Sequence, residues 1–499
     1  MKYFKSVLSF LLISSSLSAQ TNPIEWQTSY GGNRSEQLPD IHQTSDGGYI
    51  IAGSSNSNNE GMGNHGFFDQ WVVKTDAAGT LEWQRSYGGT ADDKANSVRQ
   101  TIDGGYIIAG STRSVDGDVT NNHGQEDFWI VKLNPNGNIA WEKTLGGSNN
   151  DAAACIRQTP DGGYIVVGKS ESNDGDITGN NGYTDVWVVK LDQDGGMQWQ
   201  KSMGGPGVEE ISSIELTTDG GYVMSGSISV SNSELNYWIV KTDSAGDLQW
   251  SKNYGGSATD KASSIKQTPD GGYVVAGSSN SSDGDITGSN GNYDYWVIKL
   301  DPSGNLQWQK SFGDNLYDYA YSIDNTDDGG SVVLGYSAST DMTNFSSNDY
   351  WLIKLKPNGD TDWQRKFGGL YDDYATTVQQ TTDGGYIMVG TSNSFSPSPG
   401  NYDYRVVKLG PETLGTHESI NPIKVSLSPN PAKNVVYINR LPGEVTVNIT
   451  DMSGRKLFSR KYNEQKAAID VSLFSNSVYL VQVQYKGEII LSEKLIINK

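Results

Sequence analysis

The chain has 499 residues and a formal net charge of −21, and 35% of its residues are apolar. This acidity argues against nucleic acid as a partner, because the phosphates would be repelled, and it suits a protein that meets cations or neutral sugars. The single cysteine, Cys155, excludes an intramolecular disulfide and is expected to be a small buried strand residue rather than a nucleophile.

The first twenty residues have the pattern of a secretory signal peptide. Lys2 and Lys5 give a basic start, Val7–Ile13 form a short apolar core, and small residues end the segment at Ala19. Such a segment is too short to span a bilayer as a helix. We therefore expect residues 1–20 to be removed on export, and no other stretch predicts a transmembrane segment.

A repeated unit fills the next 390 residues or so. The turn Asp-Gly-Gly recurs at intervals of 51 to 58 residues, each time before an apolar strand that ends in glycine. Self-similarity at such a period is the signature of a repeat architecture. The turns begin at Asp46, Asp103, Asp161, Asp219, Asp270, Asp328 and Asp383.

Each unit contains four short runs of β-branched and aromatic residues, bounded by Gly, Asn, Asp and Pro. Four antiparallel strands per unit and seven units predict an all-β fold, a seven-bladed β-propeller over residues 21–409. A parallel solenoid is the alternative, and it would need end caps. Ile24–Tyr30 copies a strand that the last unit lacks, so we expect this first strand to complete the last blade and close the ring.

All 13 tryptophans fall on two repeat positions, one opening each unit and one in a later strand, where Arg405 replaces the seventh. This regularity favours packing between blades over a platform for sugar rings. At Arg405 we expect an adjustment of packing at the closing seam, with a ligand contact as the alternative.

Acidic residues recur as regularly as the tryptophans. One acid follows each Gly-Gly turn, and a second series precedes the later strand, with Asn236 in unit four. We expect each acid to accept backbone N–H bonds in its own turn, with a ring of carboxylates on one face as the alternative. The first series is Glu36, Asp93, Asp151, Glu210, Asp260, Asp318 and Asp373, and the second includes Asp69, Asp127, Asp185, Asp294, Asp349 and Asp403.

A glycosidase needs two carboxylates in different environments, one of them with a raised pKa. Repeated acids in repeated environments do not provide this asymmetry, which weighs against an enzyme. Unit four is the shortest and carries the adjacent acids Glu209 and Glu210, which are the candidate catalytic residues of that alternative. Unit six also departs from the repeat, at Gly313-Asp314 and at Ser331, so we expect any local site in these two units.

Three long loops carry the motif Asp-Gly-Asp-x-Thr. Closely spaced aspartate oxygens around a glycine suit Ca²⁺, a hard cation that takes several oxygen ligands. The match to an EF-hand loop is partial, since the glutamate of the twelfth position is missing, and a solvated turn is the alternative. No other cofactor is predicted. The candidate metal ligands are Asp116, Asp118, Asp174, Asp176, Asp283 and Asp285.

The repeats stop near residue 409, and residues 410–424 read as a linker. Short alternating strands then predict a small antiparallel β-sandwich over residues 425–499. This segment contains the motifs Ser428-Pro-Asn-Pro431, Asp451-Met-Ser-Gly-Arg455 and Val478-Tyr-Leu-Val481. Through these motifs it resembles the C-terminal sorting domain of type IX secretion cargo in Bacteroidetes. The repeats are similar to those of secreted Bacteroidetes propeller proteins.

The resemblance implies passage through the outer membrane by the type IX machinery, and a secreted or surface-attached protein. Together with the repeats it predicts a non-enzymatic propeller that binds a polysaccharide, a protein or a matrix ligand. The alternatives are an endoglucanase-like glycoside hydrolase or lyase acting on extracellular polysaccharide, and a calcium-stabilised structural scaffold.

Overall fold

The computed structural model describes residues 20–59, 61–230, 234–340, 346–396, 401–414, 426–441, 443–451, 455–485 and 488–499. The predicted signal peptide lies outside the described residues, except for Gln20. The chain divides into two compact units. The larger spans Asn22–Glu412, and the smaller contains Thr413–Lys499 together with the N-terminal residues up to Thr21.

Four-stranded antiparallel sheets build the larger unit, seven of them among the described residues. Six consist of strands consecutive in sequence. The first is β3 (Glu36–Gln43), β4 (Tyr49–Ser55), β5 (Asp69–Thr75) and β6 (Leu81–Tyr87). The second is β7 (Asp93–Gln100), β8 (Tyr106–Thr112), β9 (Asp127–Leu133) and β10 (Ile139–Leu145). The third is β11 (Asp151–Gln158), β12 (Tyr164–Ser170), β13 (Asp185–Leu191) and β14 (Met197–Met203).

The next three sheets repeat this order. The fourth is β15 (Glu209–Leu216), β16 (Tyr222–Ser229), β17 (Leu235–Thr242) and β18 (Leu248–Tyr254). The fifth is β19 (Asp260–Gln267), β20 (Tyr273–Ser279), β21 (Asp294–Leu300) and β22 (Leu306–Phe312). The sixth is β23 (Asp318–Asn325), β24 (Ser331–Thr340), β25 (Ser346–Leu355) and β26 (Thr361–Phe367).

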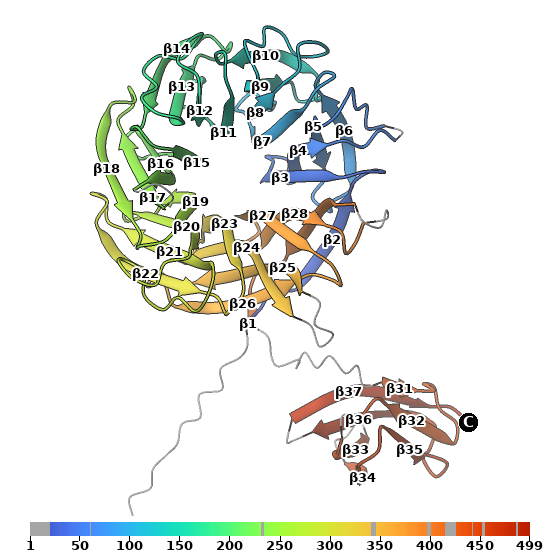
Figure 1. Cartoon of the computed structure of the whole chain (residues 1–499). Helices are drawn as coiled ribbons and strands as arrows, with labels where there is room; N and C mark the ends of the chain where they lie inside the picture. Colours follow the sequence, from blue (N-terminus) through green and yellow to red (C-terminus); the bar gives the residue numbers. More distant parts are fainter. Residues whose placement is uncertain are drawn as a thin grey trace, which may run out of the picture. The chain divides into compact units, whose positions relative to one another are not determined.

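The last sheet joins the two ends of the unit. It contains β27 (Asp373–Gln380), β28 (Tyr386–Ser392) and β29 (Asp403–Leu409), and its outer strand is β2 (Ile24–Tyr30). β2 runs antiparallel to β29, from the Ile24–Leu409 pair to the Tyr30–Tyr404 pair. Figure 1 shows the sheets around a ring, with the first strand of each sheet nearest the centre. The larger unit is therefore a propeller-like ring whose closure depends on pairing between distant parts of the sequence.

The apolar core lies between neighbouring sheets rather than within one. The two central strands of each sheet are covered on both faces, and strands such as β8 and β9 are buried along their whole length. One cluster, for example, joins Ile50 and Val72 of the first sheet to Val98 and Trp129 of the second. Because each sheet packs only on its neighbours, the same contacts recur at every seam.

The smaller unit is a β-sandwich. One sheet consists of β31 (Ser426–Ser428), β32 (Val435–Asn439) and β35 (Lys466–Asp470), and the other has the order β34 (Lys456–Tyr462), β33 (Val445–Asp451), β36 (Ser477–Tyr485) and β37 (Glu488–Ile497). Residues of both sheets, such as Val436 and Val447, share one apolar core. β1 (Gln20–Thr21) pairs with β30 (Thr413–Leu414). Among the described residues no helix is long and apolar enough to cross a membrane.

Candidate functional site

A cluster of seven tyrosines is the most distinctive surface feature of the ring. It lies where β23, β24 and β27 meet the loops before β21 and β29. The rings contact one another in a chain: Tyr293 stacks on Tyr319 at 5.0 Å between ring centres, Tyr319 lies 5.4 Å from Tyr336, and Tyr336 lies 4.8 Å from Tyr374. The members are Tyr293, Tyr317, Tyr319, Tyr321, Tyr336, Tyr374 and Tyr402.

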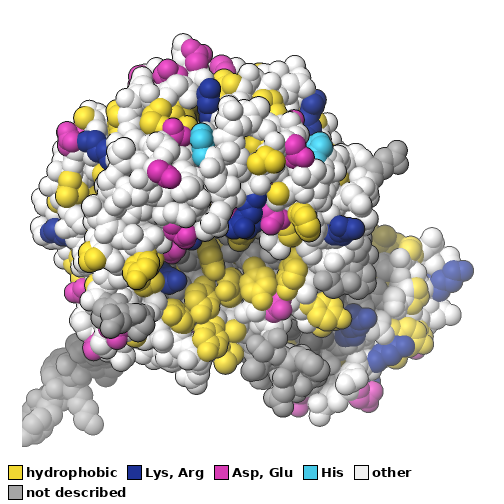
Figure 2. Space-filling view, turned by 45° about the horizontal axis from the view of Figure 1, so that its top comes forward, with side chains coloured by type: hydrophobic (Ala, Val, Ile, Leu, Met, Phe, Trp, Pro, Cys, Tyr) yellow, Lys and Arg dark blue, Asp and Glu magenta, His cyan; other side chains and the backbone are white. Residues whose placement is uncertain are grey.

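The tyrosine cluster borders a cavity of about 380 Å³, lined by Tyr321, Tyr336, Tyr374 and Tyr402 together with Leu38 and polar groups of β3 and β28. Tyr317 and Tyr321 remain 48% and 40% exposed, so two of the rings offer a face to a ligand. Figure 2, in which tyrosine counts as hydrophobic, shows such side chains gathered beside a hollow on one face of the ring.

Polar groups accompany these rings. The Asn348 amide donates to Asp372 at 2.8 Å and to the Tyr374 hydroxyl at 3.1 Å. Burial and the Asp372 charge raise the pKa of Tyr374 to about 12, so its hydroxyl stays protonated at neutral pH. The cavity thus combines flat aromatic faces with hydroxyl and amide groups at their edges.

This cluster was not predicted, although the sequence contains a signal for it. The tyrosines are departures from the repeat, concentrated in neighbouring units, and β-strand alternation places Tyr319 and Tyr321 on one side of the same strand. At the position of Tyr319 the other units have Gln37, Lys94, Ala152, Glu210, Lys261 and Tyr374. Unit six also departs from the repeat at Gly313-Asp314, between β22 and β23, and at Ser331 of β24, and these residues lie outside the tyrosine cluster.

The structure separates the two candidate catalytic acids. Glu209 and Glu210 are successive residues of β15, so their side chains leave opposite faces. Glu209 is buried and accepts the Gly205 N–H at 2.8 Å, and burial raises its pKa. Glu210 is half exposed and lies 3.3 Å from Lys169. The two carboxylates do not face a common cavity, and their catalytic role stays a prediction without support from this geometry.

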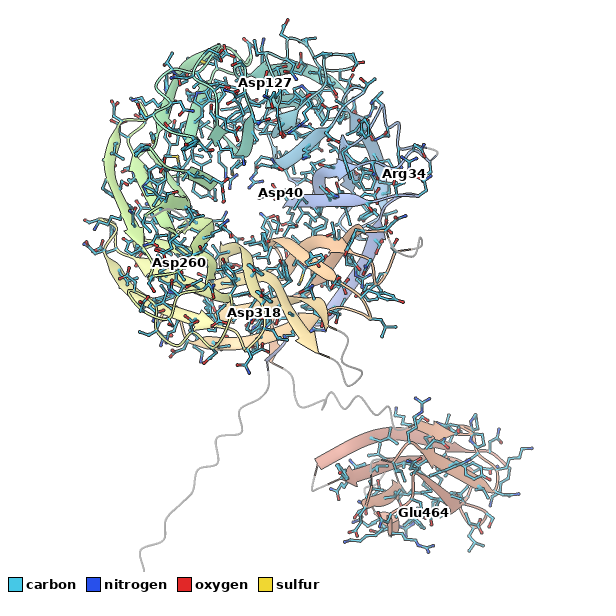
Figure 3. The ribbon with its side chains drawn as sticks, in the orientation of Figure 1. Arg34, Asp40, Asp127, Asp260, Asp318 and Glu464 are labelled. Atoms are coloured by element: carbon cyan, nitrogen blue, oxygen red, sulfur yellow. The ribbon has the colours of Figure 1, made fainter. Side chains whose placement is uncertain are left out.

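The placement of unit four in the first acidic series needs a correction. Glu209, not Glu210, takes the repeat position, because it opens β15 and its N–H bonds to Thr184 O as that of Asp93 bonds to Phe68 O. The expectation that these acids accept backbone N–H groups is confirmed, for example by Asp151 with Gly147 at 2.8 Å and Asp260 with Gly256 at 2.8 Å. Asp127, Asp260 and Asp318 are labelled around the ring in Figure 3.

The three Asp-Gly-Asp loops fold against the Gly-Gly turns. In the second of them, Asp174 accepts the Ser148 N–H at 2.8 Å and Asp176 lies 3.2 Å from the Gly146 N–H. Within the described residues, no group of three or more His, Cys, Asp or Glu side chains is spaced to hold a metal ion. Calcium binding by these loops stays a prediction. The corresponding acids of the other two loops are Asp116 with Asp118 and Asp283 with Asp285, and they make the same contacts.

The tryptophans pack within the ring. Trp71, Trp129, Trp187 and Trp296 are fully buried, and the tryptophans that open the units are partly covered by the turn of the next sheet. At the position that lacks tryptophan, the Arg405 guanidinium lies 4.0 Å over the Phe395 ring and donates to Gln27 at 2.6 Å. This residue therefore packs at the closing seam against the first strand.

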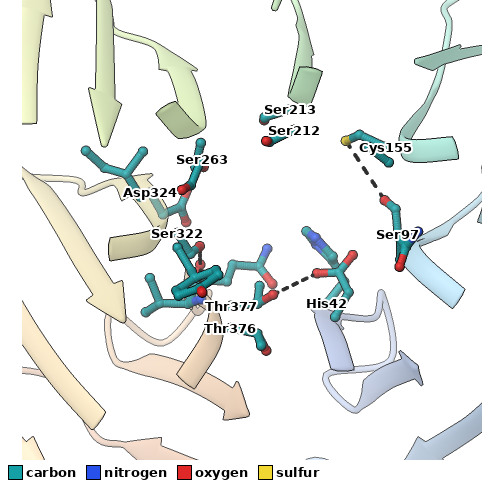
Figure 4. Close-up of a pocket in the computed structure, with 18 of the residues that line it drawn as sticks. His42, Ser97, Cys155, Ser212, Ser213, Ser263, Ser322, Asp324, Thr376 and Thr377 are labelled. Carbon is teal, nitrogen blue, oxygen red and sulfur yellow. Dashed lines mark hydrogen bonds between the residues drawn. The ribbon is translucent and has the colours of Figure 1, made fainter. Parts of the chain in front are cut away.

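The inner strands surround a second cavity, of about 310 Å³, at the centre of the ring (Figure 4). Arg99 pairs with Asp40 at 2.6 Å, and Glu215 accepts from Lys266 at 2.5 Å. Burial alone would raise the pKa of Glu215, but the Arg157 and Lys266 charges overcome it and hold that pKa well below its usual range. One repeat position supplies most of this network, through His42, Arg99, Arg157, Glu215, Lys266, Asp324 and Gln379.

Cys155 lies in the same wall, buried, with its sulfur 3.0 Å from Arg157 Nη1. The described carboxylates of the central cavity have a cation or a hydrogen-bond donor as partner, and Asp324 accepts the Gln380 N–H at 3.0 Å. The centre of the ring is consequently cross-linked by ion pairs between strands, and the tyrosine cluster is the better candidate for a ligand site.

Strand pairing defines the class of protein as an all-β, propeller-like ring with a terminal β-sandwich. Residues 426–498 match the family model described as the secretion system C-terminal sorting domain. The predicted resemblance is thereby confirmed: the chain carries a type IX secretion sorting domain. This domain indicates secretion to the cell surface or the extracellular space, and it implies interaction with the secretion machinery.

Other similarities are distant. The regulatory protein FlaEY of Caulobacter vibrioides is 26% identical over 188 residues, which are 34% of this chain and only 18% of that protein. PorZ, a surface component of the type IX secretion system of Porphyromonas gingivalis, matches with a TM-score of 0.43 and 10% identity, over 96% of this chain and 61% of that one. The Pan2 WD40 domain of Neurospora crassa matches with a TM-score of 0.47 and 8% identity, over 79% of this chain and 97% of that one.

Proposed function

We propose that this secreted ring is a non-enzymatic binding module and that its ligand is a polysaccharide held at the tyrosine cluster. The observation that carries the proposal is the chain of contacting tyrosines beside a cavity, with Tyr317 and Tyr321 exposed. Tyrosine offers a rigid, amphipathic surface at low entropic cost. Its ring face suits the C–H face of a sugar, and its hydroxyl suits the sugar hydroxyls.

Charge favours an uncharged glycan. The chain carries a net charge of −21, so a polyanionic polysaccharide would be repelled over most approaches. Asp372 and Asn348 at the edge of the cluster carry carboxylate and amide oxygens of the kind that accept hydrogen bonds from sugar hydroxyls. We therefore expect a neutral polysaccharide chain to lie across the exposed rings with its hydroxyls toward these edge groups.

The test is affinity electrophoresis of the mature chain in gels that contain neutral polysaccharides, with an assay of reducing ends in the same samples. Retardation without new reducing ends supports the proposal. Replacing Tyr317 and Tyr321 together by alanine should weaken binding by about tenfold or more, since an aromatic anchor is worth about 1 kcal/mol or more. Tyr183→Ala is the matched control, because Tyr183 is 81% exposed and lies outside the tyrosine cluster.

Glycoside hydrolysis is the second candidate, favoured by one observation. Glu36 lines the tyrosine cavity, and burial together with its neighbour Asp403 raises its pKa to about 8, the range of a general acid. Against this candidate, Glu36 is wholly buried and accepts hydrogen bonds from the Ser55 and Ser57 hydroxyls, and related acids recur at other seams. New reducing ends that disappear in Glu36→Gln would favour the enzyme over the binding module.

A further inference from the structure

Pairs of buried carboxylates recur at the seams between neighbouring sheets. One member lies in the third strand of a sheet, at its first residue in every pair except that of Asp349, and the other opens the inner strand of the next sheet. In five of the six described pairs, both side chains approach the first glycine of the turn, and in the pair of Asp349 with Asp373 Asp349 does so. The acidic pairs are Asp69 with Asp93, Asp127 with Asp151, Asp185 with Glu209, Asp294 with Asp318, Asp349 with Asp373, and Asp403 with Glu36.

The seam between the second and third sheets shows the geometry in detail. Asp127 and Asp151 are both 0% exposed. A methyl group placed on Gly146 would come within 2.3 Å of Asp127 Oδ1 and 3.0 Å of Asp151 Oδ2, so oxygens of both side chains face the same point. Only glycine leaves room for them here.

Asp127 and Asp151 each have one oxygen that is satisfied and one that is not. Asp127 Oδ2 accepts the backbone N–H of His123 at 2.6 Å and lies 3.2 Å from the Nδ1 of the same residue. Asp151 Oδ2 accepts the Gly147 N–H and the Ser172 hydroxyl, both at 2.8 Å. Among the described residues, Oδ1 of Asp127 and Oδ1 of Asp151 are buried and find no hydrogen-bond partner. The Oδ1 atoms of Asp69, Asp185 and Asp294 are likewise buried and find no hydrogen-bond partner among the described residues.

Burying two like charges with an unpartnered oxygen on each is unfavourable unless a proton or a cation joins them. A hard divalent cation takes carboxylate oxygens and completes its shell with backbone carbonyls and water.

We propose that the acidic seams with the geometry of Asp127 and Asp151 each bind one divalent cation, Ca²⁺ by preference, between the two buried carboxylates. Ca²⁺ tolerates 6 to 8 oxygen ligands in flexible geometry, whereas Mg²⁺ demands a near-ideal octahedron. The cation links the third strand of one sheet to the first strand of the next, so it stabilises the ring across its seams. The exposed carboxylates of the Asp-Gly-Asp loops, such as Asp174, are not ligands of this site.

The chain contains its own control. At the seam between the fourth and fifth sheets, Asn236 stands where the other seams have an acid, and its amide approaches Gly255 together with Asp260. An amide is therefore sterically compatible with a seam. Asp127→Asn copies this arrangement at an acidic seam, and Asn236→Asp converts the fourth seam into an acidic one.

Equilibrium dialysis of the mature chain against CaCl₂ at neutral pH, after treatment with EDTA, tests the proposal. We expect several bound Ca²⁺ per chain, one fewer in Asp127→Asn and one more in Asn236→Asp. We also expect Ca²⁺ to raise the melting temperature, most of all in Asn236→Asp. Asp174→Asn is the matched control and should keep the wild-type stoichiometry.

Two results would overturn the proposal. One is a chain that binds no Ca²⁺ at millimolar concentration while it remains folded by circular dichroism. The other is loss of Ca²⁺ in Asp174→Asn with no loss in Asp127→Asn, which would assign the cation to the loops. Because Asn236→Asp adds a carboxylate rather than removing one, it keeps the test decisive even if Asp127→Asn fails to fold.

Discussion

Two glycine-to-alanine substitutions in one sheet would measure how tightly neighbouring sheets pack against each other. Gly220 and Gly246 both end hairpin turns of the β15–β18 sheet in left-handed conformations, with φ of +84° and +76°. An alanine methyl at Gly220 would meet nothing within 4 Å, whereas at Gly246 it would lie 2.7 Å from the Trp199 ring of the preceding sheet. The two changes share the backbone strain and differ in the contact between sheets.

The expected magnitudes follow from these contacts. Left-handed strain costs Gly220→Ala about 1 kcal/mol. Gly246→Ala bears the same strain and an overpacking cost of about 1 to 3 kcal/mol more. At about 2 cal/mol/K of unfolding entropy per residue, a ring of about 390 residues loses roughly 1 °C of melting temperature in the first variant and roughly 3 to 5 °C in the second.

Scanning calorimetry of both variants, with urea unfolding as a second measurement, gives the comparison. Equal losses of stability in Gly220→Ala and Gly246→Ala would refute the reasoning, because they would show that Trp199 leaves room for a methyl group at Gly246. In the double variant Gly246→Ala with Trp199→Ala the overpacking is relieved, so the stability lost to it should be regained. The stability lost with the indole ring itself should not be regained.

Three further predictions concern the charged turns, the closure and the sorting domain. Burial would raise the pKa of Asp103, but hydrogen bonds from Lys132 and Thr101 lower it to about 2. Urea unfolding at a series of pH values should therefore show that Asp103→Asn is destabilising above pH about 4 and becomes neutral as the pH falls through about 2. A loss of stability that does not depend on pH would contradict this. Deleting Ile24–Tyr30 leaves β29 without its partner and should sharply lower the melting temperature; an unchanged melt would exclude closure by this strand. Removing residues 426–499 should retain the protein in the periplasm, and continued surface exposure in protease-shaving experiments would contradict the sorting role.

The repeat made most of the architecture predictable. An Asp-Gly-Gly hairpin and two tryptophan positions per unit mark strands and turns by local chemistry alone, and the missing strand after Leu409 pointed to the copy at Ile24–Tyr30. The sorting domain was likewise predictable, because its motifs are short, ordered and local. Register was less secure: among the adjacent acids of unit four, Glu210 was predicted at the repeat position, and strand pairing and burial give that position to Glu209.

The sequence by itself determined the strands, their turns and the export signal at the C-terminus, since each depends on neighbours within a few residues. Tertiary structure alone decided the sites. The tyrosine cluster brings together residues up to about a hundred positions apart, and the central ion pair between Arg157 and Glu215 joins two units. The seam carboxylates, such as Asp127 and Asp151, become a pair only when one sheet packs against the next. A repeat makes every unit look alike, so function depends on which departures the ring brings into contact.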